Sequence, residues 1–242
     1  MLTATAFWQH LYEKSQQIDL QNKQVEHIQL NHNIALPAAV DTDSTGWLPS
    51  PAKGVLRLML EREGGEQTVR ATSIVAYAAG SQFAPHTHPK GEEFFVLAGT
   101  FSDEGGDYPT GTYVRNPPGS SHKPFSREGC LIWVKLQQFE ATDSQHVVTD
   151  VTQAPADFSN EYWSKKVLFK DYETVAMIYV RQNFTLPLEW IQSGAEILVL
   201  SGELSDDIRQ YQQGHWMRFP ANSTSTLRAN QSSQFLIKYG HL

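Results

Sequence analysis

Three histidines and one glutamate lie close together in the sequence and have the side chains of a transition-metal site. His86, His88 and Glu92 lie within residues 80–99, and His122 lies within residues 111–122. Three imidazoles and one carboxylate form a complete ligand set for a divalent metal ion. The sequence therefore predicts a metal site formed by these four side chains.

The spacing of the four residues indicates how a sheet would bring them together. His86 and His88 are two residues apart, so both rings project from the same face of an extended chain. Glu92 follows in the same phase, whereas Glu93 would point to the opposite face and is the alternative carboxylate ligand. His122 follows a segment rich in Gly, Asp and Pro, so we expect it to return on a different strand.

The composition excludes several classes of function. The chain has 242 residues and is 40% hydrophobic, which is enough for one large all-β domain or two small ones. Its net charge of −7 and its lack of a basic run argue against nucleic-acid binding. The single cysteine, Cys130, excludes a disulfide framework and a cysteine-based zinc finger. The sequence shows neither a secretory signal nor a membrane-length apolar run, so we expect a cytoplasmic protein with no membrane partner.

Most of the sequence is typical of short strands. Apolar runs bounded by Gly, Pro, Asn and Asp occur at residues 55–60, 71–78, 92–99, 111–116 and 130–136. Strands at such intervals, with turn residues between them, are typical of a sandwich or a barrel. Residues 5–16 differ, because Phe7 with Leu11 and Trp8 with Tyr12 have the i,i+4 spacing of one short amphipathic helix.

The second half of the chain repeats part of the first. VLAGTFSDE at 96–104 matches VLSGELSDD at 199–207 at five of nine positions. GTYVRNPPGSSH at 111–122 matches GHWMRFPANSTS at 214–225, with Gly, Arg and Pro in register. Both pairs have the same offset of 103 residues, from 96 to 199 and from 111 to 214, which indicates an internal duplication. The polar, turn-rich residues 140–162 are the expected join.

The second copy has lost the predicted ligands. At the same offset, the four ligand positions carry Glu189, Ile191, Ala195 and Ser225. One carboxylate without neighbouring imidazoles is a poor transition-metal site. We therefore expect the second copy to be structural or to form an interface.

An arginine recurs in both copies, as Arg115 and Arg218. Its recurrence in the copy that lacks ligands favours a structural role, such as pairing with Asp103 and Asp206. A charged partner inside the metal pocket is the alternative.

Aromatic residues are frequent near the predicted ligands. Phe94, Tyr113 and Tyr77 are candidates for lining an apolar pocket that would bind a small organic molecule. Phe94 shares the expected strand face of Glu92 and is the first candidate. The alternative is that these rings form ordinary barrel core.

The two ligand stretches resemble the two motifs of the cupin family. The first stretch fits the pattern G-x5-H-x-H-x3-E-x6-G, through Gly80, His86, His88, Glu92 and Gly99. The second fits G-x5-P-x-G-x2-H, through Gly111, Pro117, Gly119 and His122. The family pattern often ends with Asn four residues later, where this chain has Ser126. More narrowly, residues 30–140 resemble the cupin-like domain of ChrR-type anti-sigma factors.

The resemblance implies an all-β fold, a double-stranded β-helix (jelly-roll) bicupin with two tandem modules and a short N-terminal helix. The expected division is a helical extension at 1–30, a metal-binding ChrR-like cupin at 31–140, a linker at 141–162 and a degenerate second cupin at 163–242. One divalent metal ion per chain is implied, with zinc expected first and iron, manganese or nickel as alternatives.

The resemblance also implies a function in binding small molecules or in stress sensing and regulation. A non-haem metal-dependent dioxygenase that acts on a dicarbonyl-like small molecule is the alternative. A small-molecule ligand and a second copy of the chain, in a homodimer, are the expected partners. Binding of a sigma factor is not expected, because the chain has no Cys-x2-Cys pair with which ChrR-type factors hold their partner.

Overall fold

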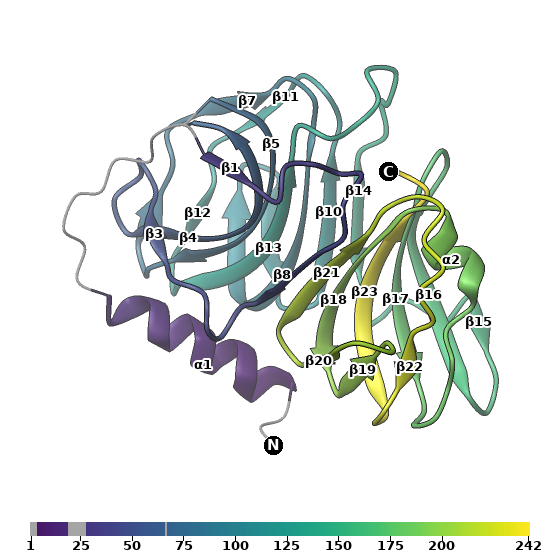
Figure 1. Cartoon of the computed structure of the whole chain (residues 1–242). Coiled ribbons are helices and arrows are strands. Elements are labelled where there is room, and N and C mark those ends of the chain that lie inside the picture. The colour runs from purple at the N-terminus through teal and green to yellow at the C-terminus, as the bar shows by residue number, and fades with distance from the viewer. Residues whose placement is uncertain (1–3, 19–27, 66) are drawn as a thin grey trace. The chain divides into compact units, whose positions relative to one another are not determined.

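The computed structural model describes residues 4–18, 28–65 and 67–242, mostly as antiparallel strands (Figure 1). The described residues divide into two units. The first unit contains those of Trp8–His32 and Thr45–Thr152, and the second contains those of Met1–Phe7, Asn33–Ser44 and Gln153–Leu242. Residues 19–27 of the expected N-terminal extension lie outside the described part of the chain.

One helix, α1 (Ala4–Gln16), covers the segment where the sequence predicts it. Trp8 and Leu11 are three residues apart and are buried, which is the pattern of a helix with one apolar face. No helix in the described residues is long and apolar enough to cross a lipid bilayer.

The first unit contains a long antiparallel sheet, whose strands include the five that the sequence predicts. The strand order is β1 (Ile28–Leu30), β4 (Val55–Gly64), β5 (Thr68–Tyr77), β13 (Cys130–Leu136), β8 (Glu92–Asp103), β10 (Thr112–Asn116) and β14 (Val147–Asp150). Shorter strands extend it: β3 (Leu48–Pro49), β6 (Ser81–Gln82), β9 (Gly106–Pro109) and β12 (Phe125–Ser126). A separate pair of strands, β7 (His86–His88) and β11 (Ser120–His122), carries the three histidines.

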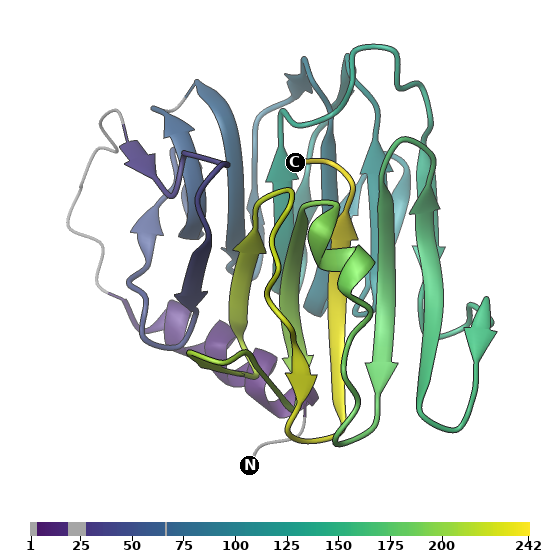
Figure 2. The same cartoon turned by 45° about the vertical axis from the view of Figure 1, so that its right-hand side comes forward.

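The second unit has a sheet of closely similar order. Its strands are β15 (Phe158–Ser159), β16 (Trp163–Lys170), β17 (Thr174–Val180), β23 (Ser233–Tyr239), β18 (Ala195–Ser201), β21 (His215–Phe219) and β2 (Ala38–Asp41). Figure 2 shows the central strands of this sheet, coloured green to yellow, side by side. A smaller sheet and a short helix complete the unit: β20 (Gln210–Gln212), β19 (Glu203–Ser205), β22 (Arg228–Ala229) and α2 (Leu188–Gln192).

The edge strands β14 and β2 come from segments that the sequence assigns differently. β14 lies in the expected linker at 141–162, yet it pairs with β10 of the first unit. β2 lies in the expected first cupin at 31–140, yet it pairs with β21 and belongs to the second unit. Neither segment has a pattern that distinguishes the two sheets, because an edge strand of four residues carries little alternation. Pairing with an available edge decides where each strand lies.

Repeated glycines occupy equivalent positions in the two units. Gly99 and Gly202 have φ of 73° and 80°, in the left-handed region where a Cβ atom is unfavourable. A Cβ at Gly99 would also overlap the carbonyl oxygen of Gly129, and one at Gly202 would overlap that of Ser232. The glycine that recurs at the 103-residue offset is therefore required by the same backbone conformation in each unit.

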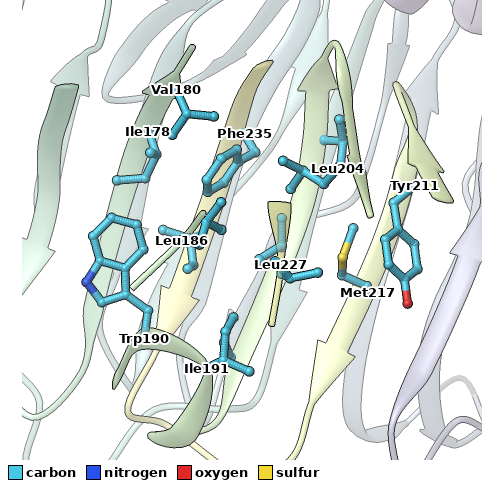
Figure 3. Packing of buried hydrophobic residues seen from close by; sticks show 14 of the residues in the cluster. Ile178, Val180, Leu186, Trp190, Ile191, Leu204, Tyr211, Met217, Leu227 and Phe235 are labelled. Atoms are coloured by element: carbon cyan, nitrogen blue, oxygen red, sulfur yellow. The ribbon is translucent and has the colours of Figure 1, made fainter. Parts of the chain in front are cut away.

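Each unit has its own hydrophobic core. In the first unit the core includes Val75, Phe94, Val96, Phe101 and Ile132. In the second unit the core includes Ile178, Leu186, Leu204, Leu227 and Phe235, whose side chains converge between the strands (Figure 3). The predominantly β architecture that the sequence predicts is confirmed.

Candidate metal centre

A short antiparallel pair of strands brings the three histidines together. β7 pairs with β11 in a register that places His122 directly opposite His86, and Ser120 opposite His88. Opposed residues of a pair project to the same face, and His88 shares that face because it follows His86 by two residues. Three imidazoles from two strands therefore meet on one side.

Glu92 reaches the histidines after a turn rather than along a continuous strand. β7 ends at His88, and the Gly91 N–H donates to the His88 carbonyl at 3.1 Å before β8 begins at Glu92. Gly91 has φ of 77°, which makes this tight turn possible. The prediction that Glu92 lies in phase with His86 and His88 on one extended run is therefore wrong in its geometry, although the turn brings the carboxylate to the same place.

The three histidines form one cluster, and Glu92 lies beside two of them. The ligand nitrogens of His86, His88 and His122 all lie within 4.8 Å of one another. The Nε2 atoms of His88 and His122 are 3.1 Å apart, and Oε2 of Glu92 is 3.5 Å from the first and 3.4 Å from the second. Metal–ligand bonds of about 2.0–2.2 Å place neighbouring ligand atoms about 3.0–3.5 Å apart. The spacing of these atoms fits one metal ion held between them.

Hydrogen bonds behind the ligands orient two of the histidines. Nδ1 of His86 donates to the Ala84 carbonyl at 2.9 Å, and Nδ1 of His122 donates to Oδ2 of Asp103 at 3.0 Å. With Nδ1 protonated in each ring, Nε2 keeps the lone pair that a metal ion requires. Such partners fix the tautomer and the orientation of a ligating imidazole.

Asn116 supports the fourth ligand. Its Nδ2 donates to Oε2 of Glu92 at 3.2 Å, and the two residues are directly paired across β10 and β8. Glu92 and Asn116 are both buried. A buried polar atom costs free energy unless it is hydrogen-bonded, so Asn116 satisfies Oε2 of Glu92 and holds the carboxylate in place.

Burial and neighbouring charges shift the pKa values of two of the histidines in opposite directions. Burial lowers the pKa of His88, and only part of this effect is offset by the Glu92 carboxylate. Burial also lowers the pKa of His122, but its hydrogen bond to Asp103 and the charges of Glu92 and Asp103 outweigh burial, so the pKa is raised. The pKa of Asp103 is lowered, because its hydrogen bonds from His122, Gly105 and Tyr108 outweigh the effect of burial.

Glu93 lies on the opposite face of β8. Its side chain is fully buried, Oε2 accepts a hydrogen bond from the Tyr113 hydroxyl at 2.6 Å, and the same oxygen lies 3.6 Å from Nη1 of Arg115. Arg115 also donates from Nε to Oδ2 of Asp143 at 3.1 Å. Glu93 thus forms an ion pair with Arg115 on the face of β8 that points away from the histidines.

The expected pairing of Arg115 with Asp103 is wrong, because Asp103 serves other groups. Oδ1 of Asp103 accepts from the Tyr108 hydroxyl at 3.0 Å, while Oδ2 accepts from His122. In the second unit, Oδ2 of Asp206 likewise accepts from the Tyr211 hydroxyl at 2.7 Å, rather than from Arg218. The recurring aspartate and the recurring arginine therefore belong to separate networks in both units.

A cavity of about 710 Å³ lies beside the metal centre. His86, His88 and Glu92 form part of its wall, and Tyr77 is another lining residue. The other two aromatic candidates lie elsewhere: Phe94 packs in the core, and Tyr113 faces Glu93. Phe94 does share the inward face of β8 with Glu92, but it lies two residues further along the strand, among the rings of Phe101 and Tyr108.

The second unit replaces the ligand region with apolar packing. Helix α2 occupies the segment that corresponds to β7 and contains the buried residues Trp190 and Ile191. The pair formed by Glu92 and Asn116 in the first unit is replaced by Ala195 and Phe219, which are also paired directly and buried. The ligand and its supporting residue have changed together.

Asn116, Arg57 and Arg62 lie at the site although neither sequence motif includes them as ligands, and Asp103 has a partner other than the predicted one. The sequence contains one indication of a role for Asn116. The position that corresponds to it in the second copy is Phe219, and that copy has also lost the ligands. The same comparison does not indicate a role for Asp103 at the site. Its counterpart Asp206 is also an aspartate, because it forms the bond to tyrosine in the second unit. Arg57 and Arg62 line the cavity from β4, outside both motifs.

Comparisons with known proteins agree with this architecture. Residues 36–140 match the family model of the ChrR cupin-like domain. No curated protein sequence matches the chain.

Among solved structures, a proposed dioxygenase from Nostoc punctiforme is similar at 16% identity, with a TM-score of 0.69 over 86% of this chain and 84% of that one. A proposed glyoxylate-induced protein from Pseudomonas aeruginosa has 15% identity and a TM-score of 0.66 over 91% and 92%. A mutant of Bacillus subtilis oxalate decarboxylase has 12% identity and a TM-score of 0.60 over 92% and 84%. At these identities the similarity concerns the fold. Residues 36–140 are therefore similar in sequence to the ChrR cupin-like domain, and the chain shares the fold of these solved structures.

Proposed function

We propose that the first unit is a metal-binding cupin that holds one divalent ion through His86, His88, Glu92 and His122. The observation that carries this proposal is the convergence of two imidazole nitrogens and the Glu92 carboxylate within 3.1–3.5 Å of one another. The orienting bonds from His86 to Ala84 and from His122 to Asp103 support it further.

Zinc is the first candidate for the metal, with iron, manganese and nickel as alternatives, because this mixed nitrogen and oxygen set suits all four. Manganese gains weight from a related fold, since Bacillus subtilis oxalate decarboxylase has Mn(II) centres. Elemental analysis of the purified full chain tests the proposal. We expect about one metal ion per chain, and loss of that ion in His88→Ala. Wild-type protein that binds no divalent metal after dialysis against zinc, manganese or iron would refute it.

We propose that this metal centre serves to bind a small molecule, in a sensing or regulatory role. The cavity of about 710 Å³ supports this role, because three of the four proposed ligands form part of its wall. A cavity of this size is typical of sites for small organic ligands. The expected signature is a ligand-dependent rise in melting temperature of the metal-loaded protein, without turnover.

The same cavity makes a metal-dependent dioxygenase the second candidate, and the similar Nostoc protein is a proposed dioxygenase. A redox-active metal such as iron would supply oxygen chemistry when bound, with a dicarbonyl-like small molecule as the substrate class. Oxygen consumption by iron-loaded protein, measured across a panel of diketones and compared with His122→Ala, distinguishes the two candidates. Consumption that depends on both substrate and His122 would favour the enzyme, and none with any substrate favours the binding protein.

We also propose that the two units are cupin modules related by duplication. The strand order β4-β5-β13-β8-β10-β14 corresponds to β16-β17-β23-β18-β21-β2, and the Tyr–Asp bond recurs at the 103-residue offset, between Tyr108 and Asp103 and between Tyr211 and Asp206. Superposition of the two units in a crystal structure tests this relationship. The homodimer stays a prediction, which sedimentation velocity checks through the mass of the particle.

A further inference from the structure

The wall of the cavity beside the metal centre contains a tyrosine whose hydroxyl has no partner in the described part of the chain. Tyr77, on β5, lines the cavity and is 4% exposed. Within residues 4–18, 28–65 and 67–242, no hydrogen bond joins its hydroxyl to another group of the protein. Burial of a hydroxyl without a hydrogen bond costs free energy, so such a group is more typical of a binding site than of a core.

The Tyr77 hydroxyl is open to the cavity, and its ring is held in place. Some polar atoms of the chain are completely enclosed without a partner, such as Nε1 of Trp133, but the Tyr77 oxygen is not one of them. Because Tyr77 lines the cavity, its hydroxyl keeps its small accessible area there. The rings of Phe83 and Phe101 pack edge-on against Tyr77, at 5.9 and 5.5 Å between ring centroids. This packing fixes the ring and leaves the hydroxyl available.

Tyr77 lies close to the histidines of the proposed metal centre. Phe83, which contacts Tyr77, also contacts His86, with 5.7 Å between their ring centroids. Phe101 connects Tyr77 to His122 in the same way, at 6.1 Å from the histidine ring. A molecule that occupied the cavity beside the histidines would therefore meet the Tyr77 side chain.

Tyr77 keeps its proton at neutral pH. Burial raises its pKa well above the usual value of a tyrosine, and the Cys130 thiol and the Glu92 carboxylate raise it further. A neutral phenol can donate a hydrogen bond. A carbonyl oxygen is a suitable acceptor, because it brings no proton that would need a partner of its own.

The wall next to Tyr77 is apolar. Val75 lies two residues away on β5 and lines the same cavity, because alternate residues of a strand project to one side. Ile132, on β13, is paired directly with Val75 and also lines the cavity. Apolar walls with a few polar groups are typical of sites for organic ligands.

We propose that the cavity binds an organic molecule with a carbonyl oxygen, which accepts a hydrogen bond from Tyr77 while the apolar part of the molecule contacts Val75 and Ile132. Tyr77 then determines specificity, because a buried donor left unpaired by an analogue without the oxygen costs affinity. The inference rests on the proposed function, since it names the class of small molecule that the cavity would hold.

Ligand-observed NMR titration of the full chain tests the proposal. The probes are methyl ketones of four to six carbons and the alkenes in which a methylene group replaces the oxygen. We expect the ratio of ketone to alkene affinity to fall about fivefold or more in Tyr77→Phe. The ratio isolates the hydrogen bond, because each probe loses the same water on entering either protein. If no ketone binds, or if the ratio is the same in both proteins, the proposal is wrong.

Tyr211→Phe is the matched control. Tyr211 belongs to the second unit, and its hydroxyl donates to Asp206. The control should keep the wild-type ratio of ketone to alkene affinity, and a fall equal to that in Tyr77→Phe would overturn the assignment.

Urea unfolding of the ligand-free variants provides a readout that a structural role would change. Tyr211→Phe removes a hydrogen bond and should lower the midpoint, whereas Tyr77→Phe removes none and should not. A lower midpoint in Tyr77→Phe would show that its hydroxyl has a partner within the folded chain, against the proposal.

Elemental analysis of the same samples distinguishes this proposal from the metal centre. A ketone preference that Tyr77→Phe removes, in a chain that binds no zinc, would support the Tyr77 site and refute the metal centre. Zinc binding with an unchanged ratio in Tyr77→Phe would support the metal centre and refute the Tyr77 site. Binding of both probe classes with an unchanged ratio would leave the small-molecule role in place and refute the choice of a carbonyl ligand.

Discussion

The two carboxylate oxygens of Asp103 accept hydrogen bonds from different residues. Oδ2 accepts from Nδ1 of His122 at 3.0 Å, and Oδ1 accepts from the Tyr108 hydroxyl at the same distance. The bond to tyrosine recurs in the second unit, where Asp206 accepts from Tyr211. The position that corresponds to His122 there is Ser225. The bond to tyrosine therefore belongs to the fold, and the bond to histidine belongs to the proposed metal centre.

Because Asp103 accepts a hydrogen bond from a proposed metal ligand, Asp103→Asn should weaken metal binding. The amide oxygen is a weaker acceptor for the Nδ1 proton of His122, so the ring is held less firmly and is less basic. We expect the affinity for zinc to fall about 10- to 100-fold, as is typical when the orienting partner of a metal ligand is removed. Competition titration with a chromophoric zinc chelator measures this change.

Asp206→Asn is the matched control for that experiment. It removes the equivalent carboxylate from a Tyr–Asp bond in the unit without ligands. We expect it to change stability but to leave zinc affinity at the wild-type value. Equal zinc affinities in the two variants would show that the Asp103–His122 bond does not support the metal.

Substitutions of the two adjacent glutamates on β8 should have different effects: one should lower metal content and the other should lower stability. Glu92→Gln removes a proposed ligand, so metal content should fall while the fold persists. Glu93→Gln leaves the ligands in place but disrupts a fully buried ion pair with Arg115, and should lower the free energy of unfolding by about 3 kcal/mol. Elemental analysis and urea unfolding of both variants check this. Loss of metal in Glu93→Gln, with Glu92→Gln unaffected, would reverse the ligand assignment.

The pH dependence of stability should include a contribution from Asp206. Burial raises the pKa of Asp206, but its hydrogen bonds from Tyr211 and the backbone of Ile208 and Arg209 outweigh burial, so the pKa is lowered. A carboxyl group with a lowered pKa in the folded state stabilises the protein above its unfolded pKa of about 3.9. That stabilisation is lost as the pH falls through the folded pKa.

Urea unfolding of wild type and Asp206→Asn between about pH 7 and pH 3 measures this contribution. We expect the difference in midpoint between the two proteins to be constant above about pH 5 and to shrink below about pH 4. A difference that stays the same down to the lowest pH would contradict a lowered pKa at Asp206.

Truncation in the core of the second unit should affect stability alone. Leu227 is fully buried among Leu186, Phe235 and their neighbours (Figure 3). Leu227→Ala leaves a cavity and should lower the free energy of unfolding by about 2–5 kcal/mol. Metal content measured well below the unfolding transition should match the wild type. A loss of metal under those conditions, where the variant is still folded, would indicate that metal binding depends on the packing of the core of the second unit.

The sequence by itself determined the class of fold and indicated the three histidines that the structure brings together. Alternating apolar runs indicated the strands, because side-chain direction in a strand repeats every two residues and is therefore a local property. The same alternation predicted that Glu92 and Glu93 point to opposite faces, but the turn at Gly91 decides which of them meets the histidines. The repeat at 103 residues also identified the copy whose ligand positions carry other residues.

Only the tertiary structure decided the contacts that depend on pairing between distant segments. β2 and β14 are too short to specify a partner, so the available sheet edge decided their positions. A bulge in β4 directed Arg62 into the cavity, against the regular alternation of the strand. His122 became the partner of Asp103 through hydrogen-bond geometry that no local pattern encodes. Side-chain periodicity acts within a strand, whereas register, bulges and the choice of hydrogen-bond partner are set by the packing of the whole unit.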